Sequence, residues 1–391
     1  MARFNNIYFY FFCSQLIFLP IYFYQTPLIS DAIDTDKAIW MHIIGLFWSA
    51  VGYFTVRYAH FLKDNQQVEP PHNDFYFFNN TFYVCSYVLI ISGIAVAVWQ
   101  VIYFVPMSDY ISQLFDSAFE ANLRLAYLLP SDEGGLPGII KMFAYAPLSI
   151  YLMSLGILNF IRLSEVDQQR LRTLSLIALS AIVIKVFFSL DRLTIMAVLL
   201  ANIFIGVKKG YIKNIRFLIF LALSFLLAHY LSTKRLENYG IIDFILLYVK
   251  LGLVNFQLMI DTCTQYTYGF STILGPLFFI FKFFHLSSPD FAYEYDWIWN
   301  PAQYFSSYAF QDFGYFYFVL FYIVGILLCQ IDLKVQKQSI YTSAVYFVVL
   351  YGIVSFMAVP AIRGVDFWLA LLLPVLLLNL FVKRVEDKNN I

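Results

Sequence analysis

The sequence predicts an all-α polytopic membrane protein with about ten transmembrane helices, and at most about twelve. Composition is the first observation: hydrophobic residues make up 61% and charged residues 13% of the 391 positions. Soluble domains have roughly 45–50% hydrophobic residues and about 25% charged residues. The second is a mean hydropathy of +0.71. The third is the recurrence of apolar runs along the whole chain, separated by short connections that alternate in charge. We therefore expect lipid to surround most of the chain.

The apolar runs define the expected helices in order, since one crossing of a bilayer needs about 20 apolar residues. The first run follows a single basic residue, Arg3, and no small-residue cleavage site comes after it, so we interpret it as a retained span. One transmembrane domain over residues 1–391 is expected. The expected spans are 6–24, 38–58, 82–105, 138–160, 173–190, 193–207, 215–231, 313–331, 340–359 and 365–382.

Lysine and arginine gather in every second connection, which indicates orientation because cytoplasmic connections are enriched in both. The opposite connections are mainly acidic, as in Asp31–Lys37 and Asp109–Glu133. Both termini are therefore expected in the cytoplasm, in a multi-pass protein of a bacterial inner membrane. The basic connections carry Arg57 and Lys63; Arg162, Arg170 and Arg172; Lys208, Lys209, Lys213 and Arg216; Lys334 and Lys337; and Lys383 and Arg384.

The alternation holds only if the long segment 232–311 crosses the membrane an even number of times, so we expect a large periplasmic loop there. Residues Gly240–Ile260 are apolar apart from Asn255 and a stripe of polar residues seven apart, Asp243, Lys250 and Gln257. Such spacing keeps the stripe on one helical face, which predicts an amphipathic helix at the interface or over a cavity.

A second apolar piece in this loop, Thr272–Phe284, is short and is interrupted by Gly275-Pro276. Together with Gly240–Ile260 it can form a re-entrant hairpin, which leaves ten spans, or two full crossings, which make twelve. We favour the hairpin.

Three arginines at expected outer span edges run against the charge trend: Arg192, Arg235 and Arg363. A guanidinium can hold a phosphate through two parallel hydrogen bonds. Lys234 precedes Arg235, and Lys185 lies on the same helical face as Arg192. The alternative is local ion pairing with Asp191, Glu237 and Asp366, which contributes only about 0–1 kcal/mol at a wet surface.

Several groups on the same side could act as a general base, and sequence alone selects no pair among them. Our candidates are Glu237, Asp312 and His285; Asp290, Glu294 and Asp296 are also present. The aromatic cluster Phe291–Trp299 either stacks on sugar rings or forms an interfacial belt.

Other chemistries lack their signatures. The chain has no Gly-rich phosphate loop, HExxH or GxSxG motif, and no basic block for nucleic acid. The four cysteines, Cys13, Cys85, Cys263 and Cys329, lie far apart without metal-ligand spacing. We expect no metal, no cofactor and no nucleic-acid partner.

The stretch Asn300–Gly314, which ends Gln311-Asp312-Phe313-Gly314 before a span, resembles the O-antigen polymerase (Wzy-type) family. Ser189-Leu-Asp-Arg-Leu-Thr194 resembles it too, and the resemblance covers roughly Thr173–Leu328. The departures are Ser306-Ser307, where a threonine is frequent, and Tyr315–Tyr317, where a second glycine often follows.

This resemblance implies a glycosyltransferase that joins undecaprenyl-diphosphate-linked oligosaccharides at the periplasmic face into O-antigen or another surface polysaccharide. The resemblance covers Arg192 and Asn300, and the charge pattern adds Arg235, Arg363 and Lys234, so these five are the candidate substrate-binding residues. Membrane lipid and a chain-length regulator protein are candidate partners. The alternatives are a flippase or exporter of the same lipid-linked glycans and an O-antigen ligase. A flippase should line a path with charge and show two similar halves, whereas ionisable residues here gather on the outer side.

Overall fold

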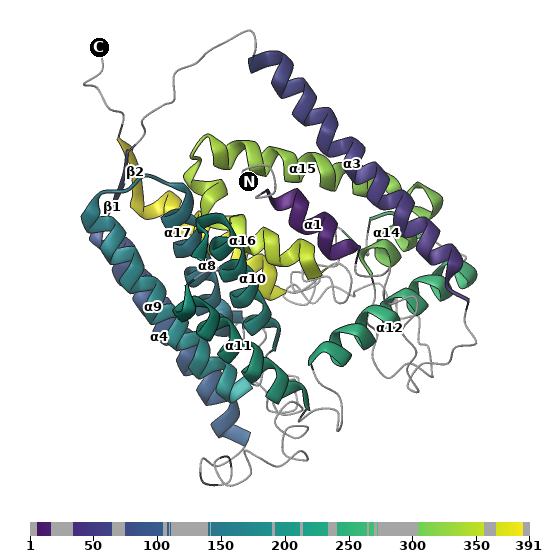
Figure 1. The fold of residues 1–391 in the computed structure, drawn as a ribbon. Coiled ribbons are helices and arrows are strands. Elements are labelled where there is room, and N and C mark those ends of the chain that lie inside the picture. The colour runs from purple at the N-terminus through teal and green to yellow at the C-terminus, as the bar shows by residue number, and fades with distance from the viewer. Residues whose placement is uncertain are drawn as a thin grey trace. The chain divides into compact units, whose positions relative to one another are not determined.

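The computed structural model describes residues 6–16, 34–64, 75–104, 108, 110, 140, 142–189, 192–211, 214–233, 241–263, 266–269, 272, 304–355 and 365–385. This part of the chain is almost entirely helical, as Figure 1 shows. The chain divides into two compact units, each assembled from segments that are distant in sequence.

The first unit comprises Met1–Pro70, Asp243–Leu333 and Gly352–Phe367. Its helices pack closely where glycines allow the backbones to approach. A Cβ atom at Gly52 would lie 2.2 Å from the carbonyl oxygen of Tyr322, and one at Gly325 would lie 2.0 Å from that of Ser49. Small residues at contacts are typical of membrane helices. The helices are α1 (Ile7–Gln15), α3 (Asp36–Asp64), α12 (Ile241–Thr262), α14 (Phe305–Phe313), the 3₁₀ turn η7 (Gly314–Phe316) and α15 (Phe318–Gln336).

The second unit comprises Pro71–Ile242, Lys334–Tyr351 and Trp368–Ile391. Here α4 and α9 run alongside each other, and both contact α8 (Figure 1). A Cβ atom at Gly156 of α8 would lie 1.9 Å from the carbonyl oxygen of Ser343 in α16. The close approach of these two helices therefore also requires a glycine. The elements are α4 (Asn80–Phe104), η3 (Phe143–Tyr145), α8 (Ala146–Phe160), α9 (Glu165–Ser189), α10 (Arg192–Lys209), α11 (Ile215–Thr233), α16 (Ile340–Val354) and most of α17 (Val365–Phe381).

A short antiparallel ribbon in the second unit was not predicted. Strand β1 (Phe75–Phe78) pairs with β2 (Val382–Val385), with Tyr76 opposite Arg384 and Phe77 opposite Lys383. Aromatic and β-branched residues favour strands; β1 consists entirely of aromatic residues, and β2 begins and ends with valine. The described part of the chain is therefore helical apart from this ribbon, which pairs the residues just before α4 with those just after α17.

Five helices in the described part are long and apolar enough to cross a membrane: Asp36–Leu62, Asn80–Tyr103, Phe143–Phe160, Glu165–Phe188 and Phe318–Gln336. Three apolar helices are shorter: Phe217–Leu226, Ile340–Val354 and Phe367–Phe381. A helical chain with several membrane-length helices is confirmed, whereas the number of about ten crossings stays a prediction.

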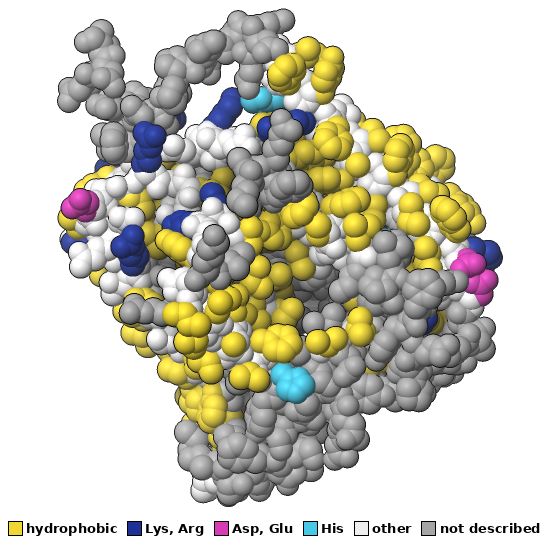
Figure 2. Space-filling view, in the orientation of Figure 1, with side chains coloured by type: hydrophobic (Ala, Val, Ile, Leu, Met, Phe, Trp, Pro, Cys, Tyr) yellow, Lys and Arg dark blue, Asp and Glu magenta, His cyan; other side chains and the backbone are white. Residues whose placement is uncertain are grey.

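The outward face of α3 fits lipid rather than water. Trp40, Phe47, Phe54 and Phe61 follow one another seven residues apart and are 66, 62, 61 and 60% exposed. Spacing of seven places them in one stripe along the helix. Figure 2 shows hydrophobic side chains over much of the described surface on one face. Because burial in hydrocarbon removes the cost of hydrating such surface, we place these side chains in the bilayer.

Candidate functional site

Asp312 is the predicted site residue whose side chain the structure describes, and it is fully buried near the end of α14. Its carboxylate accepts three hydrogen bonds. Thr267 Oγ1 donates to Oδ1, while the backbone N–H of Thr272, at 2.7 Å, and the Thr272 hydroxyl both donate to Oδ2. A buried carboxylate is stable only when such donors replace water. Asp312 therefore fixes the Thr267–Thr272 segment of the long connection against α14.

The end of α14 is shaped by Gly314, whose φ of +54° is unfavourable for other residues. A Cβ atom there would also lie 2.6 Å from the Tyr266 ring. The turn that follows Tyr266 covers the last carbonyl groups of α14: Thr267 N–H donates to Gln311 O, and Tyr268 N–H donates to Asp312 O, both at 3.0 Å. The helix end is thereby satisfied by a turn from another part of the chain.

This break corrects one predicted boundary. The span predicted at 313–331 begins instead at Phe318 and continues to Gln336, after the 3₁₀ turn η7. The hydropathy is continuous through Gly314, so an apolar run alone does not reveal that the backbone changes direction there. Asp312 consequently lies on a separate short helix next to the span.

Next to α14 lies a buried histidine that the sequence analysis did not select. His42 of α3 is 1% exposed, and its Nδ1 lies 2.8 Å from the Oγ of Ser306 in α14. The Tyr304 hydroxyl donates to the carbonyl of Val249 in α12 at 2.7 Å. Residues from the stretch Asn300–Gly314 thus contact both α3 and α12. An imidazole inside an apolar run is costly, and that signal could have drawn attention to His42.

Of the two settings predicted for the polar stripe of α12, the water-exposed interface is wrong at Gln257, because this side chain is buried at 4% exposure. Its Oε1 accepts from the Ala38 N–H at 3.0 Å and its Nε2 donates to Asp261 Oδ2 at 2.8 Å. Ala38 N–H belongs to the first turn of α3 and has no partner within its own helix. The amide therefore supports a helix terminus instead of facing water. The helix itself, predicted over Gly240–Ile260, is found at Ile241–Thr262.

The end of α12 reaches the surface beside the start of α3. Asp261 Oδ1 and Lys37 Nζ lie 2.9 Å apart, with 42% and 69% of these side chains exposed. The Gln257 amide and the Lys37 ammonium lower the pKa of Asp261 below its usual 3.8. This exposed pair marks the wet end of α12.

Lys185 is fully buried on α9. Its Nζ donates to Thr194 Oγ1 at 3.0 Å and lies 3.6 Å from the centre of the Tyr145 ring. A hydroxyl and an aromatic face both stabilise a buried ammonium. These contacts join the end of α9, the start of α10 and η3.

The remaining predicted site residues stay predictions. Arg192 is the first residue of α10, but its side chain is outside those described. Residues 273–284 of the predicted hairpin also lie outside the described ranges, as does the Asp243 side chain. The predicted residues that fall outside the described part are Lys234, Arg235, Glu237, His285, Asn300 and Arg363.

Within the described residues, no group of three or more His, Cys, Asp or Glu side chains is placed to hold a metal ion. The cysteines Cys13, Cys85, Cys263 and Cys329 are all free thiols. Comparisons with models of protein families, with curated proteins and with solved structures find no match for this chain.

Proposed function

We propose that this protein is a membrane glycosyltransferase that polymerises polyprenyl-diphosphate-linked oligosaccharides at the exoplasmic face of a bacterial inner membrane. One observation carries the proposal: the buried Asp312 network ties the long connection between α12 and α14 to the helix that precedes α15. This connection contains Asn300, a candidate sugar-binding residue, and His285, a candidate base. The resemblance to O-antigen polymerases falls on the same stretch, Asn300–Gly314.

The reaction has three chemical requirements. The hydroxyl oxygen of the acceptor forms a bond to the anomeric carbon of the donor sugar, and the bond from that carbon to the diphosphate oxygen breaks. The polyprenyl diphosphate leaves with the electron pair, so cations near it stabilise the developing charge. A base takes the proton of the hydroxyl as the new bond forms.

We assign the diphosphate to Arg192, Arg235 and Arg363, with Lys234 adjacent to Arg235 in the sequence, and the sugar to Asn300. Among the candidate bases, Glu237 and His285 are preferred over Asp312. Both oxygens of the Asp312 carboxylate already accept hydrogen bonds from Thr267 and Thr272, so its geometry suits a positioning residue. Asp312 would then keep the loop in place while another group moves the proton.

The test compares variants of Arg192 in a deletion strain complemented at matched protein level. The measurement is the length distribution of the lipid-linked glycan. Arg192→Lys should fail nearly as badly as Arg192→Ala, because an ammonium cannot reproduce the planar two-donor fork. Each loss should be about tenfold or more in rate, since one charge-assisted hydrogen bond contributes roughly 1.5–3 kcal/mol. Lys209→Ala, at the opposite end of α10, is the matched control and should give a full ladder.

A full ladder from Arg192→Ala would remove the proposal. The deletion strain itself separates the alternatives. Single repeat units attached to the acceptor indicate loss of a polymerase, and long chains left on the lipid carrier indicate loss of a ligase. Repeat units trapped in the inner leaflet indicate loss of a flippase.

A further inference from the structure

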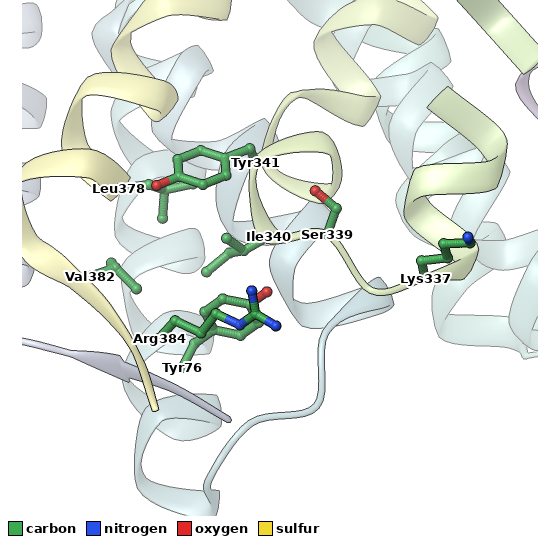
Figure 3. A pocket seen from close by; sticks show the side chains of 8 residues that line it. All are labelled: Tyr76, Lys337, Ser339, Ile340, Tyr341, Leu378, Val382 and Arg384. Atoms are coloured by element: carbon green, nitrogen blue, oxygen red, sulfur yellow. The ribbon is translucent and has the colours of Figure 1, made fainter. Parts of the chain in front are cut away.

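A cavity of about 350 Å³ in the second unit lies between the β1–β2 ribbon, the α15–α16 connection and the end of α17. Figure 3 shows the Arg384 guanidinium beside the Tyr76 ring, with Ser339 and Lys337 from the connection across from them. Tyr76 and Arg384 face each other in the ribbon register, so their side chains share one face. The cavity size lies within the range of small-ligand sites.

The polar lining of this cavity is suited to an anion. Arg384 and Lys337 contribute two cations, and none of the eight lining residues is acidic. Hydroxyl groups of Ser339, Tyr341 and Tyr76 complete the polar part of the lining. Guanidinium, ammonium and hydroxyl groups are the donors that proteins use for phosphate.

The rest of the lining is apolar and belongs to the ends of apolar helices. Ile340 is the first residue of α16, Leu378 lies in the last turn of α17, and Val382 follows that helix directly in β2. The sequence predicts that α16 and α17 cross the membrane, so we place the cavity at the level where these helices leave the bilayer. At that level an anionic headgroup meets cations while its acyl chains lie beside apolar helices.

We propose that this cavity binds the phosphate group of an anionic membrane lipid. The geometry points to Arg384 as the main cation at the phosphate, with Ser339 as a neutral donor and Lys337 at the rim of the cavity. The inference does not depend on the proposed glycosyltransferase activity, because none of these residues belongs to the proposed active site. A zwitterionic lipid would place a trimethylammonium group near two cations and should bind less well. The same donors accept free inorganic phosphate, so the test must separate the two sources.

The chain contains its own matched control for general charge effects. Lys383 adjoins Arg384 in β2, is exposed and pairs with Phe77, but does not line the cavity. Successive side chains of a strand point to opposite faces, so Lys383 and Arg384 differ in direction while sharing charge and location. Removing either one changes the net charge equally.

The experiment uses the full-length protein purified in a non-ionic detergent. Native mass spectrometry counts bound dioleoylphosphatidylglycerol and, separately, dioleoylphosphatidylcholine over a concentration series. Wild type should retain the anionic lipid preferentially. Arg384→Gln should bind it about tenfold more weakly, since one charge-assisted contact is lost, and Lys337→Gln/Arg384→Gln should bind it more weakly still. Lys383→Gln should bind like wild type. Helix content measured by circular dichroism verifies that the variants are folded.

Two results would overturn the proposal: equal retention of both lipids by the wild type, or an equal loss of binding in Lys383→Gln and the double variant. A final arm adds millimolar inorganic phosphate. No displacement of the lipid supports a membrane headgroup as the ligand. Full displacement, with retention of the phosphate by wild type alone, would instead assign the cavity to free phosphate.

Discussion

At the scale of single residues, Asp312 offers the sharpest test. A carboxylate that anchors the loop and a carboxylate that transfers a proton predict different effects of substitutions on stability and activity. If the carboxylate anchors the loop, Thr272→Val should lower the unfolding temperature about as much as Asp312→Asn. Each variant removes hydrogen bonds to a buried charged group worth roughly 1.5–3 kcal/mol. The double variant should cost little more than either single one, since contacting residues are not additive. The measurement is thermal unfolding in detergent, with glycan ladder length recorded in parallel.

The opposite pattern would assign Asp312 to the chemistry itself. In that pattern Thr272→Val unfolds at the wild-type temperature and polymerises normally, while Asp312→Asn is stable yet inactive. Thr262→Val is a suitable control, because Thr262 is exposed and its hydroxyl donates to the carbonyl of Leu258 in its own helix.

Substitutions of Gln257 and Asp261 should lower the free energy of unfolding by unequal amounts. Gln257→Leu leaves the buried Ala38 N–H without its acceptor, so we expect a loss of about 1–3 kcal/mol in the free energy of unfolding. Asp261→Asn disrupts an exposed pair and should cost at most about 1 kcal/mol. Chemical unfolding in detergent near pH 7 measures both. A larger cost for Asp261→Asn would contradict the burial of Gln257.

The pH dependence of the Asp261 pair follows from its lowered pKa. Gln257 and Lys37 stabilise the ionised carboxylate, so its folded pKa lies below the usual 3.8. The folded state then binds fewer protons than the unfolded state at low pH. The contribution of this pair to stability is present above the unfolded pKa and is lost as the pH falls through the folded pKa. Between pH 5 and pH 8 (roughly the range well above both values), wild type and Asp261→Asn should keep a constant difference.

At the scale of elements, α12 tests whether its polar residues face water. In a cysteine-free background, cysteine at position 257 should resist an impermeant maleimide, because Gln257 is buried. Cysteine at position 262 should react, because Thr262 is exposed beside the Lys37–Asp261 pair. Cysteine at position 253 serves as a buried control, since Leu253 is 0% exposed. Rapid labelling at position 257 would show that the polar face of α12 faces water, as the sequence predicts for an interfacial helix.

The same helix shows which features sequence could predict. Its bounds follow from continuous hydropathy, and they agree to within two residues with Ile241–Thr262. Which way its polar face points could not be inferred from the sequence. A glutamine that supports another helix and a glutamine that faces water give the same seven-residue spacing. Likewise, a φ of +54° at Gly314 leaves no trace in hydropathy, and the ribbon depends on pairing between residues about 300 positions apart.

The candidate site, too, could be predicted from the sequence only in part. The stretch Gln311–Gly314 could be selected from residue types and position before a span. The threonine donors to Asp312 could not, because Thr267 and Thr272 are ordinary polar residues whose role depends on a turn that returns to α14. His42 was missed for a similar reason, since its partner Ser306 is 264 positions away.

At the scale of the whole molecule, contacts within the second unit bring the basic connections together. The ribbon joins the residues before α4 to the tail, and Arg170 at the start of α9 donates to Asn80 at 2.9 Å. Lys208 of α10 lies 3.7 Å from the ring centre of Phe160 at the end of α8. These are the connections whose lysines and arginines predicted a common side. Their common location supports the alternation, while which side is cytoplasmic stays a prediction.

Reporter fusions decide that last question. The basic connections should face the cytoplasm, because lysine and arginine are retained there during insertion. Green fluorescent protein fused after Lys209 or at the C-terminus should therefore fluoresce, and alkaline phosphatase at the same points should be inactive. Fusions after Leu274 or Asp296, both in the long connection and outside the described residues, should show the reverse. A cytoplasmic signal from the Asp296 fusion would move Asn300 and the candidate bases away from the exoplasmic lipid diphosphate. The proposed chemistry would then have no substrate on the side where its groups lie.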